Sequence, residues 1–126
     1  VPTPHQARVY DLPSLFAGKL HAVLCRRWKT RVKGRDFYDL VWYIGRRVPL
    51  NLSHLEARIR QSGDWLHERP LDSAGLSLLL QERFTTIDFD QAKEDIVPFL
   101  KDQRELALWS QGFFSELIPQ IQITAI

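Results

Sequence analysis

Apolar residues recur along the chain at the three- and four-residue spacing of amphipathic helices, with short polar segments between them. Pro13 suits the first turn of a helix, because the N–H that it lacks would have no partner there. From this point the apolar positions at helical spacing are Leu12, Leu15, Phe16, Leu20, Val23 and Leu24. They predict a first helix over residues 12–27. A second stripe, beginning at Phe37, predicts a helix from Asp36 to a point before Pro49.

Two capping patterns predict where later helices begin. Ser53 and Glu56 have the spacing of a capping box, in which each side chain bonds the backbone N–H of the other residue. Asp88 and Gln91 have the same spacing and predict a further helix start. Pro98 is expected to disturb the end of that helix. The four later helices are predicted over residues 53–59, 73–84, 88–100 and 103–117.

These patterns predict a mainly α fold, a single bundle-like domain of five to six helices that covers residues 1–126. The length of 126 residues and the apolar content of 44% suffice for one ordinary core. Residues 8–10 form a candidate short N-terminal strand. The tail, residues 120–126, is compatible with an extended conformation.

The composition excludes several kinds of protein. Cys25 is the single cysteine, which excludes an internal disulfide and fits a reducing, cytoplasmic setting. The four histidines lack the spacing of a metal-binding helix, so we expect no metal site made by this chain alone. No run approaches the roughly 20 apolar residues of a membrane span, and no membrane partner is expected. The opening, Val-Pro-Thr-Pro without an initiator Met, suggests a piece of a longer protein.

Charge is distributed unevenly along the chain. Residues 19–47 hold nine Lys or Arg and two Asp, a balance of +7, whereas the whole chain carries only +2. The remainder is therefore acidic, with a balance of −5. Such asymmetry indicates an anionic partner at one end of the domain.

Lys19 lies at the edge of the first apolar stripe, four residues after Leu15 and three after Phe16. Its stem could pack while the ammonium reaches water, or the ammonium could point into a cleft and hold a phosphate. Arg26 follows two turns later on the same face, which favours an anion site.

Residues 26–35 link the first two helices and contain six basic residues. If this link is extended, its alternating basic side chains would bind phosphates, and Trp28 could stack on a base. The alternative is a solvated loop. Asp36 and Asp39 follow at the start of the second helix, where they could cap it and complement its dipole. Asp39 points away from the apolar stripe and could instead serve as a general base or pair with an active-site lysine.

Two segments, LFAGKLHAVL at residues 15–24 and KGRDFYDL at residues 33–40, are more specific together than any single residue. In this order they resemble the K-L-x-A-L…R…K-x-R-D-x-Y-D-L segment of the nucleotidyl transferase AbiEii/AbiGii toxin family. The later helices are similar to the family only in general character. The chain resembles the carboxy-terminal helical half of such an enzyme.

The resemblance implies a function and a set of site residues. In the family, an amino-terminal nucleotidyltransferase core binds NTP and Mg²⁺ through a Gly-Ser turn and a D-x-D pair, and the helical half adds a lysine and aspartates. By position, the catalytic residues would be Lys19, Asp36 and Asp39. The implied reaction transfers a nucleotide from an NTP to an acceptor such as tRNA, in a toxin–antitoxin or abortive-infection system of phage defence. A cognate antitoxin is an expected partner.

The basic residues of this region are expected to bind the substrates. Those assigned to the substrate are Arg26, Lys33 and Arg35, and those assigned to the nucleic acid are Arg27, Lys29 and Arg31.

The chain departs from the family in one respect, because it contains no Gly-Ser turn followed by D-x-D. The D-x-D at residues 88–90 fits a helix start instead. We therefore expect Mg²⁺ and NTP to bind only with the nucleotidyltransferase core, and this chain alone to bind neither and to be inactive. Two alternatives stay open: a helical module that binds nucleic acid without catalysis, and a structural domain in which Lys19 and the aspartates only cap and pair.

Overall fold

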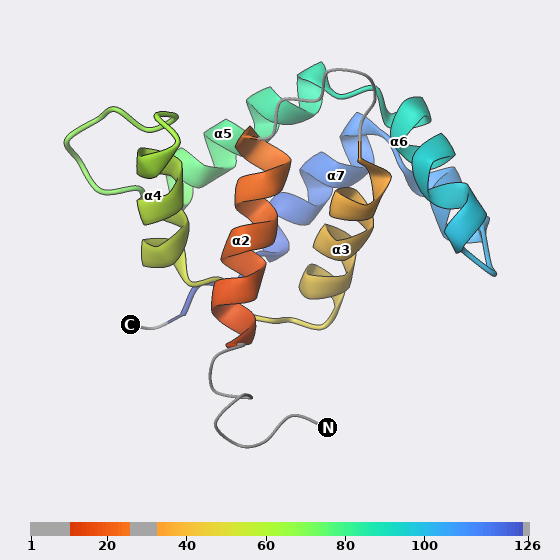
Figure 1. Ribbon diagram of the computed structural model, residues 1–126, viewed down its shortest axis with the longest axis horizontal. Coiled ribbons are helices and arrows are strands. Elements are labelled where there is room, and N and C mark those ends of the chain that lie inside the picture. The colour runs from red at the N-terminus through yellow and green to blue at the C-terminus, as the bar shows by residue number, and fades with distance from the viewer. Residues whose placement is uncertain (1–10, 26–32, 125–126) are drawn as a thin grey trace.

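The computed structural model describes residues 11–25 and 33–124 of the chain. This part folds into six α-helices and three short 3₁₀-helices (Figure 1). The α-helices are α2 (Leu12–Cys25), α3 (Gly34–Gly45), α4 (Leu52–Gln61), α5 (Ser73–Thr86), α6 (Phe89–Ile96) and α7 (Gln111–Leu117). The 3₁₀-helices are η1 (Val97–Phe99), η2 (Arg104–Leu108) and η3 (Ile118–Gln120). The mainly α fold is confirmed.

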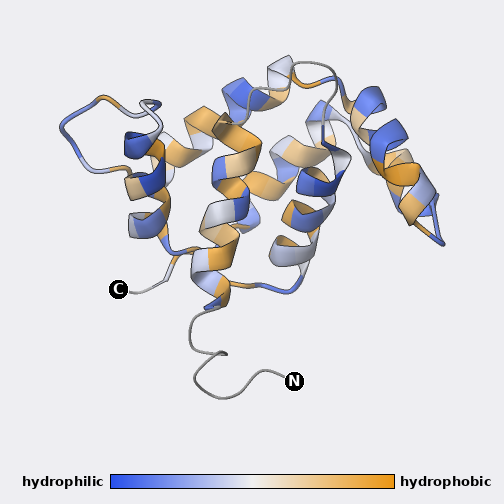
Figure 2. Ribbon diagram, in the orientation of Figure 1, coloured by the Kyte–Doolittle hydropathy of each residue, from blue (hydrophilic) through white to orange (hydrophobic). Residues whose placement is uncertain are grey.

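Helix α2 occupies the centre of the fold and packs against α3, α4 and α5, while α6 packs on α3 and α7 on α5 (Figure 1). The apolar side of α4 faces α2, as Figure 2 shows. A cluster of aromatic rings joins α3, α5, α6 and α7, and its members Phe37, Phe84, Phe89 and Phe114 have ring centroids 5.0 to 6.5 Å apart. The buried residues of α2 and α3, which come from the first and second apolar stripes, belong to the same core.

The start of α3 lies directly on α6. The Gly34 N–H donates to Asp95 Oδ2 at 2.8 Å, and a Cβ atom at Gly34 would overlap the backbone carbonyl oxygen of Ala92. Glycine is therefore required here by the close approach of the two helices.

The third helix begins differently from the prediction. Its N-cap is Asn51, whose side chain accepts from the backbone N–H of His54 at 3.1 Å, and Ser53 lies within the first turn of α4. Glu56 does not close a capping box. It accepts instead from the Leu71 N–H at 2.8 Å and pairs with Arg60, which holds the loop between α4 and α5.

Two other predicted helices are shorter than expected. The Asp88 cap is confirmed, because its side chain accepts from the Gln91 N–H at 3.1 Å, but α6 ends at Ile96 and a 3₁₀ turn follows around Pro98. The stretch 103–117 is divided into η2 and α7, since Ser110 caps a new helix.

The C-terminal tail is extended where it meets the rest of the fold. Ile123 forms a parallel bridge with Leu50, with the Leu50 N–H donating to the Gln122 carbonyl and the Thr124 N–H to the Leu50 carbonyl. The candidate strand at 8–10 lies outside the described residues, as do residues 26 and 27 of the first predicted helix. Among the helices that the structure describes, none has the length and apolar character needed to cross a membrane.

Candidate functional site

Lys19 connects helices α2 and α3, which carry the two segments that resemble the toxin family. Helices α2 and α3 lie side by side and run in opposite directions (Figure 1). The Lys19 Nζ lies 2.9 Å from Asp39 Oδ2 and 3.3 Å from Asp36 Oδ1. The structure therefore brings together the three residues that the resemblance assigns to catalysis.

The three side chains differ in exposure. That of Asp36 is 5% exposed, that of Lys19 25% and that of Asp39 34%, so the cluster runs from the core to the surface. Burial alone would lower the pKa of Lys19, but the hydrogen bond and charge of Asp39, together with the charge of Asp36, outweigh it and hold the pKa above the ordinary 10.5. The Lys19 ammonium is therefore charged at neutral pH.

Tyr43 completes the cluster one turn after Asp39. Its ring stacks on Phe16, with centroids 5.1 Å apart and planes 4° from parallel. Burial and the charge of Asp39 raise the pKa of Tyr43, although Lys19 opposes this shift. The phenol is therefore neutral at neutral pH and forms an apolar wall beside the ion pair.

Asp36 is not the N-cap of α3. The helix begins at Gly34 after Lys33, and the N-cap residue makes no side-chain hydrogen bond. Asp36 lies inside the first turn, where a carboxylate is favoured by the helix dipole, and its side chain is directed to Lys19. The capping interpretation of Asp36 was wrong because the helix starts two residues earlier.

The remaining predicted residues divide into two groups. Lys33 and Arg35 are exposed at the start of α3, and the Arg35 guanidinium lies 5.4 Å from the ring centroid of Phe99 in η1. Arg26, Arg27, Lys29 and Arg31 lie outside the described residues.

A magnesium ion does not fit the cluster. Both carboxylates, Asp36 and Asp39, already bond to the Lys19 ammonium, and the Asp36 side chain is buried, so the described cluster does not present a pair of open carboxylates to the ion. Within residues 11–25 and 33–124, no three His, Cys, Asp or Glu side chains gather closely enough to hold a metal ion.

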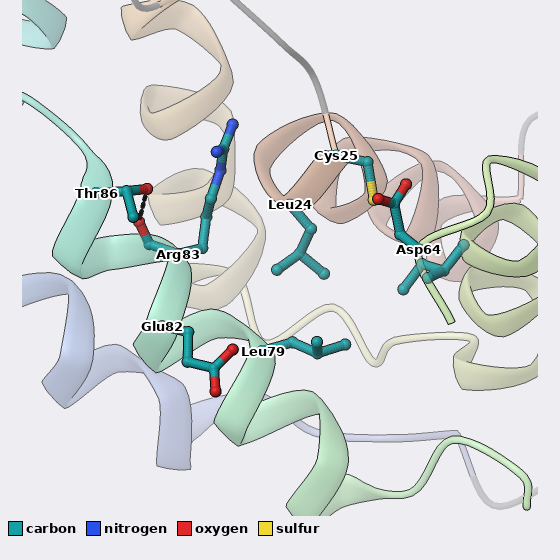
Figure 3. A pocket seen from close by; sticks show the side chains of 8 residues that line it. Leu24, Cys25, Asp64, Leu79, Glu82, Arg83 and Thr86 are labelled. Carbon is teal, nitrogen blue, oxygen red and sulfur yellow. Dashed lines mark hydrogen bonds between the residues drawn. The ribbon is translucent and has the colours of Figure 1, made fainter. Parts of the chain in front are cut away.

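A separate cavity of about 250 Å³ lies between α2 and α5. Figure 3 shows the side chains around it, which include Leu24, Cys25, Asp64, Leu79, Glu82, Arg83 and Thr86. Burial and the charge of Asp64 raise the pKa of Cys25 to about 11, so its thiol is protonated and a poor nucleophile at neutral pH. Arg83 donates to the Val23 carbonyl at the end of α2. Cys25 therefore offers no activated nucleophile to this cavity, and Lys19, Asp36 and Asp39 are not among the described residues that line it.

Trp42 and Arg46 were missed as site candidates. Trp42 is 40% exposed, and the Arg46 guanidinium lies 5.0 Å from its ring centroid. The signal was present in the sequence, because Trp42 and Arg46 are four residues apart, on the side of the helix that carries Asp39.

The fold and the cluster define a helical domain that presents a lysine, held by two aspartates, between antiparallel helices. The family model described as nucleotidyl transferase AbiEii toxin, Type IV TA system, matches residues 2–114. The chain therefore belongs to this toxin family, and an antitoxin is the partner that this type of system indicates. Comparisons with curated proteins and with solved structures gave no match.

Proposed function

We propose that this chain is the helical part of a nucleotidyltransferase that transfers a nucleotide from an NTP to an RNA acceptor such as tRNA. The observation that carries the proposal is the geometry of Lys19, which is shared between buried Asp36 and partly exposed Asp39. An ammonium with a raised pKa at a surface is suited to binding phosphate as a point charge.

Each residue of the cluster has a distinct task in this reaction. Asp39 is the more exposed carboxylate, and it accepts the proton of the acceptor hydroxyl as that oxygen bonds to the α-phosphorus and pyrophosphate leaves. Lys19 offsets the phosphate charge. Asp36 touches no substrate because it is buried, and it positions the Lys19 ammonium.

The nucleotide and Mg²⁺ require carboxylates that this chain does not supply. The D-x-D that begins at Asp88 is used to start α6, since the Asp88 side chain caps the helix, and Asp90 pairs with Lys93 at 3.6 Å. We therefore infer that the cluster forms an active site together with a nucleotidyltransferase core. This chain alone then has no transferase activity. Modification of tRNA by the whole toxin would stop translation and so serve phage defence.

The test measures incorporation of labelled NTP into tRNA by the protein that carries the nucleotidyltransferase core. Asp39→Asn is expected to lower kcat/KM about 10²- to 10⁴-fold, because it removes the proton acceptor, and Lys19→Met is expected to act in the same direction. Asp90→Asn is the matched control, since it removes an exposed carboxylate that also pairs with a lysine.

Thermal unfolding of each variant separates loss of chemistry from loss of fold. Equal activity of Asp39→Asn and Asp90→Asn would contradict the proposed role of Asp39. Nucleotide addition by the 126-residue chain alone would contradict the requirement for a separate core.

A further inference from the structure

The outward face of α3 carries a continuous stripe of polar and aromatic residues. Arg35, Asp39, Trp42 and Arg46 are spaced by four, three and four residues, so they fall on one side of the helix. The core residues Phe37, Leu40 and Ile44 occupy the opposite side. The stripe, which we define as these four residues with Phe99, therefore faces away from the core.

Each end of the stripe holds a guanidinium over an exposed aromatic ring. At the start of α3, Arg35 lies 5.4 Å from the centroid of Phe99, which is 66% exposed. Near the end, Arg46 lies 5.0 Å from the centroid of Trp42, which is 40% exposed. The Lys19–Asp39 ion pair lies between these two pairs along the helix.

Among the exposed large apolar residues that the structure describes, Trp42 and Phe99 are the aromatic ones, and each has a guanidinium beside its ring. The core is complete without them, since Phe37, Leu40 and Ile44 already bury the inner face of α3. Proteins that bind single-stranded nucleic acids place exposed aromatic rings beside cationic side chains. The bases stack on the rings, and the cations bind the phosphate backbone.

The charges around the stripe suit a polyanion. The described cations near it are Lys19, Lys33, Arg35, Arg46 and Arg47, against the three carboxylates of Asp36, Asp39 and Asp95, the last of which accepts from the Gly34 N–H. Arg35 and Arg46 are eleven residues apart, which corresponds to about 16 Å, or roughly four to five nucleotides stacked at 3.4 Å. A single strand along α3 would therefore pass directly over Asp39.

We propose that this stripe binds the single-stranded end of the acceptor RNA, with one base stacked on Phe99 and another on Trp42. The proposal rests on the proposed function for the identity of the acceptor. The two rings hold the strand on either side of the Lys19–Asp39 pair, so the hydroxyl presented to the Asp39 carboxylate is the 2′-hydroxyl of a nucleotide held between them. A duplex does not fit this site, because its bases are stacked on one another and cannot stack on protein rings.

The test measures the Kd of the 126-residue chain for a short fluorescein-labelled single-stranded RNA and for the same sequence as a blunt duplex, by fluorescence anisotropy without NTP. We expect tighter binding to the single strand. Phe99→Ala and Trp42→Ala are each expected to raise the Kd for the single strand about 5- to 150-fold, the range for loss of one stacked base.

Three control variants make the outcome specific. Leu108→Ala removes an exposed apolar side chain of η2 and is expected to leave the Kd unchanged. Phe99→Leu keeps an apolar side chain without a ring and is expected to behave as Phe99→Ala, whereas Phe99→Trp restores binding. Circular dichroism checks that each variant is folded.

The inference is overturned if the chain binds duplex and single strand equally, or if the ring variants behave as Leu108→Ala. These results are independent of nucleotide transfer. If the core-containing protein transfers nucleotide but Phe99→Ala binds the single strand as tightly as the wild type, the stripe is refuted as the binding site and the proposed function is retained. Ring-dependent binding without any transfer would refute the proposed function and leave the stripe as a single-strand binding site.

Discussion

At the scale of the residue, Lys19 and Asp39 contribute differently although they form one ion pair. Asp39 is partly exposed, and a pair of this kind contributes about 0–1 kcal/mol to stability. Lys19 also faces Asp36, whose carboxylate is buried, so removing the ammonium leaves that charge with less compensation. Lys19→Met is therefore expected to be the more destabilising of the two substitutions.

The raised pKa of Lys19 predicts how stability depends on alkaline pH. A pKa raised by folding means that the contribution of the ammonium is fully present below the ordinary 10.5 and is lost as pH rises through the folded-state pKa. Urea midpoints measured from neutral to strongly alkaline pH should fall, and they should fall less steeply in Lys19→Met.

Cys25 and Tyr43 also have raised pKa values, so the slope of the wild type alone does not isolate Lys19. The difference between Lys19→Met and the wild type isolates it, with Lys101→Met, an exposed lysine, as the control. Parallel slopes for all three proteins would show that Lys19 makes no such contribution.

At the scale of the element, the helix starts depend on short polar side chains that bond a backbone N–H three residues later. Asn51, Asp72, Asp88 and Ser110 all act in this way. The Asn51 cap has a second task, since its side-chain amide donates to Ser14 Oγ at 3.3 Å and its backbone N–H to the Pro13 carbonyl. It thereby joins the start of α4 to the start of α2.

Substitution at this cap distinguishes the observed helix start from the capping box that the sequence suggested. Asn51→Ala is expected to lower the free energy of unfolding by about 1 kcal/mol, because the His54 N–H loses its acceptor. Ser53→Ala is expected to change it by no more than about 0.5 kcal/mol, since Ser53 is exposed within the helix. Urea denaturation measures both, and a larger effect for Ser53→Ala would favour the capping box.

At the scale of the whole molecule, α3 is positioned by a helix on each side. Its contact with α2 forms the Lys19 cluster, and its contact with α6 places η1 so that Phe99 lies beside Arg35. The candidate site therefore depends on three segments that are distant in the sequence. The packing of α3 on α6 is tight at Gly34, where a single added Cβ atom would overlap the Ala92 carbonyl oxygen.

Two glycine substitutions in α3 test this sensitivity. Gly34→Ala places a Cβ against the Ala92 carbonyl, so the helices must separate, at an expected cost of about 1–3 kcal/mol in the free energy of unfolding. Gly45→Ala meets no atom within 4 Å, and an alanine in place of a helical glycine is expected to stabilise the protein by about 0.5–1 kcal/mol. Thermal or urea unfolding measures both; destabilisation by Gly45→Ala and tolerance of Gly34→Ala would contradict the packing described.

The sequence alone determined the features that arise from local interactions. The apolar spacing predicted α2 and α3, and Asp88 was recognised as a cap, because periodicity and capping depend on residues within a few positions of one another. The order of the segments at residues 15–24 and 33–40, which contain Lys19, Asp36 and Asp39, indicated the toxin family. The roles of individual residues within the cluster did not follow from order alone.

Only the tertiary structure decided the features that depend on distant partners. Glu56 leaves the predicted capping box because the Leu71 N–H and Arg60 become available to it only in the folded chain. Phe99 reaches Arg35 because α6 packs on α3, and no local pattern encodes that contact. The physical reason is that a side chain forms its most favourable set of contacts in the folded structure, and those partners come from elements whose packing local periodicity does not specify.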